Sequence, residues 1–128
     1  LLMAKLFLVV AAISGLMAVV IGAFGAHGLK DRVAEDLLVI YQTGVQYHFY
    51  HTFALLAVSL LLLRYPQLGL LNWSGGFFII GTLIFSGSLY VMALTGFRWL
   101  GAITPIGGVV LIIGWLMLVA AAYKGVGE

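Results

Sequence analysis

Three histidines, His27, His48 and His51, are the side chains of this sequence best suited to proton or metal chemistry near neutral pH. His48 and His51 are three residues apart and would share one helix face, and His27 could complete a metal or haem ligand set. However, imidazoles with no carboxylate or thiolate partner coordinate a metal poorly, and the chain has no cysteine. We therefore predict no metal ion and no cofactor. The alternative is a redox or metal/haem-binding membrane subunit that uses His27 and His51.

Other polar side chains are expected to converge on the same region. Thr82, Ser86 and Tyr90 follow one another at intervals of four, and Thr104 begins the next apolar segment. If the apolar segments are antiparallel helices, these groups and the histidines occupy one half of the molecule. We predict a ligand-binding cluster with these members: His27, Gln46, Tyr47, His51, Ser86, Ser88, Tyr90 and Thr104.

This polar cluster has two interpretations from sequence. Such residues commonly hydrogen-bond one helix to another within a membrane, and they also form clefts for lipid headgroups or quinones. Ser86 or Ser88 with a histidine makes a poor hydrolase, because the spans contain no acid and no nucleophile-elbow sequence. An ion-coupled pump would also lack its usual buried carboxylates. We therefore predict a non-enzymatic protein that binds a lipid-like ligand or a partner helix.

The elements that must position these residues are four apolar runs separated by the few charged residues. The 128 residues are 64% hydrophobic and 8% charged, which indicates one membrane domain over residues 1–128. Each run has the roughly 20 residues that a helix needs to cross a bilayer, and the backbone in lipid must be helical. The first run resembles a signal peptide but is too long, so we expect it to be retained. The predicted spans are 6–26, 43–63, 73–95 and 105–123.

The segment between the first two spans, residues 30–42, is predicted to hold a short helix of its own. Val33, Leu37, Leu38 and Tyr41 recur at helical spacing among five charged residues, which is typical of an amphipathic interfacial helix. An exposed Arg32–Asp36 pair is expected on it. The predicted fold is an all-α integral membrane four-helix bundle with this interfacial helix between spans 1 and 2.

Glycines and other small residues are expected to form the contacts between these spans, because lipid solvates leucine as well as protein does. Gly81 and Ser88 are seven residues apart in the third span, and Gly107 and Gly114 in the fourth. Self-association into a homo-oligomer is also expected, since one bundle cannot bury every glycine-rich face. The first span carries the longest such stripe, with spacings of four and three: Ala11, Gly15, Ala18, Gly22 and Gly25.

The charged residues give some information about partners and about orientation in the membrane. The pI near 9.1 depends on six scattered cations with no cluster, so we predict no nucleic-acid partner and take membrane lipid as the partner. The cations divide evenly between the two ends of the predicted bundle. We favour an orientation with both termini in the cytoplasm.

Four ordered blocks of residues resemble one known family. They are Gly22–Gly28, Gln42–Tyr47 with His51, Phe85–Tyr90, and Thr104–Gly108 with Gly114 and Trp115. They resemble the YgdD/YwdK-like family of small four-span membrane proteins, and the resemblance extends over nearly the whole chain. The resemblance implies the bacterial inner membrane, no established activity and no cofactor. His27 and His51 fall on the motif positions of that family, whereas His48 departs from them.

Overall fold

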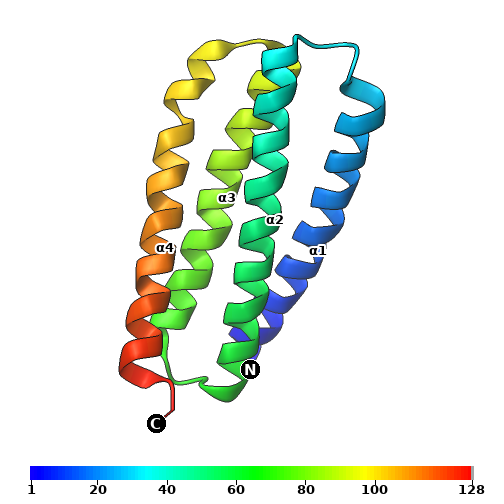
Figure 1. Ribbon diagram of the computed structural model, residues 1–128. Helices are drawn as coiled ribbons and strands as arrows, with labels where there is room; N and C mark the ends of the chain where they lie inside the picture. The colour runs from blue at the N-terminus through cyan, green and yellow to red at the C-terminus, as the bar shows by residue number, and fades with distance from the viewer. Residues whose placement is uncertain (128) are drawn as a thin grey trace.

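The computed structural model describes residues 1–127 and is entirely helical in its regular structure (Figure 1). Four helices are long and apolar enough to cross a membrane, and successive helices run in opposite directions, so the start of α1 and the end of α4 lie at the same end of the molecule. The elements are α1 (Leu2–Phe24), the π-helical turn η1 (Gly25–Leu29), α2 (Glu35–Arg64), α3 (Gly69–Thr95), the 3-10 helix η2 (Arg98–Ala102) and α4 (Thr104–Gly125).

The prediction of a separate interfacial helix is wrong. The amphipathic residues after Ala34 belong to the first turns of α2, in which Leu37 and Tyr41 are buried. No proline or other strong helix breaker separates this segment from the second span, so one helix continues through both. Upstream, η1 extends α1 directly to Leu29, so only five residues connect the two helices.

Asp36 also has a different partner from the one predicted. Its carboxylate accepts a hydrogen bond from the Arg98 guanidinium at 2.7 Å, whereas Arg32 lies in the non-helical connection before α2. The ion pair links the first turn of α2 to η2. Both side chains are 58% exposed, so the contact adds little to stability.

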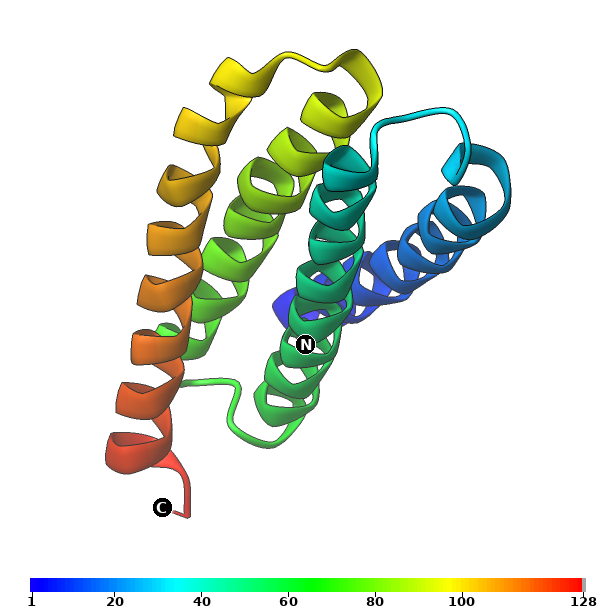
Figure 2. The same ribbon diagram turned by 45° about the horizontal axis from the view of Figure 1, so that its top comes forward.

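The helices pack mainly in chain order, α1 on α2, α2 on α3 and α3 on α4. Near the chain termini α1 also meets α3, because Gly75 leaves room for the ring of Phe7. Toward its other end α1 diverges from α3, as the tilted view shows (Figure 2). The fold is therefore open on one side, where α1 and α3 separate and α2 lies between them.

The predicted stripes of small residues are confirmed as packing surfaces. A Cβ atom added to Gly15 would lie 3.5 Å from Thr52 Cγ2, and one added to Gly22 would lie 3.4 Å from Val45 Cγ1, so this side of α1 faces α2. On the other side of the molecule, a Cβ atom at Gly107 would collide with the Phe85 backbone. The α3–α4 contact therefore requires glycine at position 107, whereas positions 15 and 22 have room for a small side chain only.

Candidate functional site

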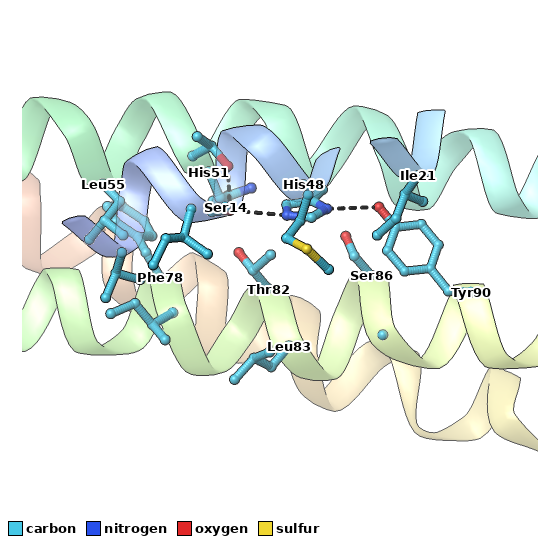
Figure 3. Close-up of a pocket in the computed structure, with 16 residues that line it drawn as sticks. Ser14, Ile21, His48, His51, Leu55, Phe78, Thr82, Leu83, Ser86 and Tyr90 are labelled. Carbon is cyan, nitrogen blue, oxygen red and sulfur yellow. Dashed lines mark hydrogen bonds between the residues drawn. The ribbon is translucent and has the colours of Figure 1, made fainter. Parts of the chain in front are cut away.

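A cavity of about 330 Å³ lies between α1 and α3, with α2 as its floor (Figure 3). Its walls combine aliphatic side chains with polar side chains from all three helices. The polar residues that line it are Ser14 from α1, His48, His51 and Thr52 from α2, and Thr82, Ser86 and Tyr90 from α3. The volume is in the range of small-ligand pockets.

A chain of hydrogen bonds crosses this cavity and connects three helices. Ser14 Oγ lies 2.6 Å from Thr52 Oγ1 and 3.0 Å from His48 Nε2. The other imidazole nitrogen, His48 Nδ1, lies 2.9 Å from the Tyr90 hydroxyl, and Figure 3 shows both bonds of His48. Each hydroxyl can donate or accept, and a neutral imidazole donates from one nitrogen and accepts at the other. The chain can therefore be polarised in either direction.

The hydrogen-bonded groups of Ser14 and His48 lie near the middle of the helices. Ser14 is about 18 Å along the axis from the start of α1, and His48 is about 20 Å from the start of α2. The spans themselves have 28 and 30 residues and so measure about 42 and 45 Å. His48 and Tyr90 therefore lie in the half of the molecule that holds the first and third connections, where the polar residues were expected, and Ser14 lies at its inner border.

His51 borders the same cavity but is engaged in a separate contact. Its Nδ1–H donates to the Tyr47 carbonyl at 2.8 Å, which leaves Nε2 to accept from the Trp115 indole at 3.0 Å. The carbonyl can only accept and the indole can only donate, so the ring is held as the neutral Nδ1–H tautomer. A role as metal ligand or proton carrier would break the bond to Trp115. Within residues 1–127, no three His, Cys, Asp or Glu side chains are grouped to hold a metal ion.

The eight residues predicted to form one cluster are divided among several places. His51, Ser86 and Tyr90 line the cavity, and the Ser86 hydroxyl donates to the Gly44 carbonyl at 2.7 Å. Ser88 and Thr104 are hydrogen-bonded to each other at 2.6 Å where α3 meets α4.

The other three predicted residues lie outside the cavity. His27 is exposed on η1, and Gln46 borders a second, smaller pocket beside Gly22 and Gly25. Tyr47 packs against Phe85, with ring centroids 4.6 Å apart. The cluster predicted from sequence is therefore not one site.

Comparisons with known proteins identify the family of this chain. The sequence profile of the family described as "Protein of unknown function (DUF423)" matches residues 21–108. The chain belongs to this family. The DUF423 protein is 45% identical over 120 residues to "UPF0382 membrane protein YwdK" of Bacillus subtilis, covering 94% of this chain and 98% of that one. It is 46% identical over 123 residues to a UPF0382 membrane protein of Staphylococcus epidermidis, covering 96% and 99%.

The predicted resemblance to YwdK-like membrane proteins is thus confirmed. No solved structure matches the chain. What this DUF423 protein binds must therefore be inferred from its own structure.

Sequence reasoning missed Ser14, His48 and Thr52 as members of this cavity. Ser14 is the single hydroxyl residue in the first predicted span, and an isolated polar group in an apolar span is a signal for a buried contact. His48 and Thr52 are four residues apart and so share one face of α2. His48 departs from the family motif positions, yet it lies at the centre of the series of hydrogen bonds.

Proposed function

We propose that this DUF423 protein is a non-enzymatic membrane protein that binds a lipid-like amphiphile in the cavity between α1 and α3. The polar head would lie against Ser14, His48 and Tyr90, and the tail would extend between the two helices into the bilayer. One observation carries this proposal: a continuous series of hydrogen bonds borders a cavity of about 330 Å³ that also has aliphatic and aromatic walls.

The mouth of the cavity supports a ligand that enters from the bilayer. Three aliphatic side chains at the edges of the cavity, Ile13, Met17 and Leu83, are 56%, 48% and 70% exposed. In a membrane-spanning helix, such surfaces face acyl chains. An amphiphile could move sideways into the cavity without leaving the hydrocarbon.

The open volume beside Ser14, His48 and Tyr90 favours a ligand-binding role over simple packing of helices. Polar groups buried between helices usually make close contacts with few voids, because an empty space removes packing partners from its lining. Here the hydrogen-bond chain adjoins open volume large enough for a ligand head. Polar cavities in proteins are normally occupied by water or ligand.

The lining also supports a binding role over hydrolysis. Ser14 and His48 are 3.0 Å apart, but the cavity lining contains no carboxylate to orient the imidazole as in a serine hydrolase. The proposal includes membrane lipid as the partner, the bacterial inner membrane as the location and both termini in the cytoplasm.

The experiment compares two glycine variants of α3. Gly87 lines the cavity and Gly76 does not, and an added Cβ atom at either position meets nothing within 4 Å. They lie about three turns apart on the same helix. Gly87→Leu should fill the cavity, while Gly76→Leu adds the same side chain elsewhere and serves as the matched control.

Each protein is purified in mild detergent, its fold is checked by circular dichroism, and co-purified lipid is quantified by mass spectrometry. We expect about one tightly held lipid on the wild type and on Gly76→Leu, and loss of most of it on Gly87→Leu. Equal lipid on all three proteins would contradict the proposal. A changed oligomeric size of Gly87→Leu with unchanged lipid would assign the cavity to a partner helix instead.

A further inference from the structure

We infer that the ligand is an uncharged lipid whose head carries a hydroxyl or carbonyl group, and that the Tyr90 hydroxyl is the group that contacts it. This inference rests on the proposed function and specifies its ligand. A phospholipid held by its phosphate is the main competitor. Two features of the cavity separate the two classes, and a third identifies the contact.

The first feature is the absence of charge from the cavity lining. The residues around the cavity include no Lys, Arg, Asp or Glu. The cations lie near the ends of the helices or in the connections between them: Lys5, Lys30, Arg32, Arg64, Arg98 and Lys124. Phosphate sites in proteins use such side chains or the backbone N–H groups of helix N-termini. Every residue around this cavity is interior to its helix, so neither kind of group is offered to an anion there.

The second feature is depth. Ser14 and His48 lie near the midpoints of their spans, about 18 and 20 Å from the helix starts. Tyr90 is five residues before the end of α3, but its hydroxyl reaches the same depth, 2.9 Å from His48 Nδ1. A charged group at that depth is expensive to bury, whereas an uncharged head with one or two oxygen atoms loses much less hydration. The chemistry that reaches these residues is therefore that of a neutral amphiphile.

The third feature is that the Tyr90 hydroxyl, at the end of the series of hydrogen bonds, can bind either a hydroxyl or a carbonyl head group. When Tyr90 O–H donates to His48 Nδ1, Nε2–H donates to Ser14, and the phenol oxygen can accept from a ligand hydroxyl. In the reverse polarity Ser14 donates to Nε2 and Nδ1–H donates to the phenol oxygen. The phenol O–H is then available to a ligand carbonyl. Both arrangements end at Tyr90, which faces the cavity in Figure 3.

The test uses the full chain in nanodiscs of phosphatidylcholine. Two uncharged probes are titrated, geranylgeraniol for the hydroxyl class and menaquinone-4 for the carbonyl class, with dioleoylphosphatidylglycerol as the anionic competitor. We expect saturable binding of at least one uncharged probe and no competition by the anionic lipid. The probe that binds identifies which head group the cavity prefers.

Two tyrosine variants locate the contact. Tyr90→Phe should weaken binding of the uncharged probe about three- to tenfold, the effect of one lost hydrogen bond in a membrane protein. Tyr47→Phe removes a hydroxyl outside the cavity and should bind like the wild type. If Tyr90→Phe does not fold, Ser14→Ala provides the same comparison from α1.

The outcomes distinguish this inference from the proposed function. Competition by phosphatidylglycerol, with binding that Gly87→Leu abolishes, would overturn the uncharged-lipid assignment and leave the lipid-binding function intact. If Tyr90→Phe and Tyr47→Phe weakened binding of the uncharged probe equally, the Tyr90 hydroxyl would not be the ligand contact. Binding that persists in Gly87→Leu, or no saturable binding of any probe, would remove both the inference and the function it specifies.

Discussion

The Trp115 indole donates a hydrogen bond to His51 Nε2 at 3.0 Å and thereby connects α4 to α2. The two rings meet edge to face with centroids 5.8 Å apart, and both pack on Phe78 of α3. Three helices are therefore held by one aromatic group around a neutral imidazole. This arrangement explains a histidine in an apolar span without a metal or a proton-transfer role.

Replacement of Trp115 by phenylalanine tests this explanation. The variant keeps an aromatic ring but leaves His51 Nε2 without its donor, so we expect a loss of about 1 kcal/mol in the free energy of unfolding. Unfolding by sodium dodecyl sulfate in mixed micelles measures it. Trp73→Phe, at a residue 64% exposed, is the control and should behave like the wild type. Equal stability of both variants would show that the His51–Trp115 bond contributes nothing.

Adjacent glycines in α4 provide a second test, of the α3–α4 contact. A methyl group at Gly107 would collide with the backbone of Phe85, which cannot move aside as a side chain can, whereas one at Gly108 comes no closer than 3.8 Å to the Phe85 ring. Gly107→Ala should destabilise the protein by about 1 to 3 kcal/mol. Gly108→Ala should be neutral or slightly stabilising, because alanine favours helix. Thermal unfolding in detergent should rank the two variants in this order.

Because Gly15 faces α2, we expect the stability of a variant at this position to depend on the size of the new side chain. An added Cβ atom lies at ordinary contact distance from Thr52, so Gly15→Ala should fold with near wild-type stability. Gly15→Leu would push α1 away from α2 and should lose about 1 to 3 kcal/mol. The same loss is expected for Gly22→Leu beside Val45. Thermal midpoints that do not separate alanine from leucine at position 15 would contradict close packing there.

Orientation in the membrane can be tested because the sequence contains no cysteine. Lys30 and Lys124 are exposed and lie at opposite ends of the helices. If both termini are cytoplasmic, a membrane-impermeant maleimide should label Lys30→Cys in intact cells and Lys124→Cys only after permeabilisation. The reverse pattern would place both termini outside.

Sequence alone determined the four spans and the family. Lipid requires every backbone group of a span to be hydrogen-bonded within its own helix, so length and hydropathy are enough to locate each one. The glycine stripes also identified contact faces correctly, because only small residues allow close approach of helices such as α3 and α4. The extent of α2 was missed, because an amphipathic segment without a breaker reads equally well as a separate helix or as the first turns of the next one.

Tertiary structure alone decided which polar residues meet. A helix solvated by lipid is apolar on most of its faces, so its sequence contains little information about which neighbour it packs against or at what angle. The divergence of α1 from α3 opens the cavity, and the packing of α1 on α2 places Ser14 against His48. The packing of α3 on α4 pairs Ser88 with Thr104 elsewhere, and His27 is exposed on η1. These positions depend on helix crossing, and helix crossing depends on side chains from several spans packing at once.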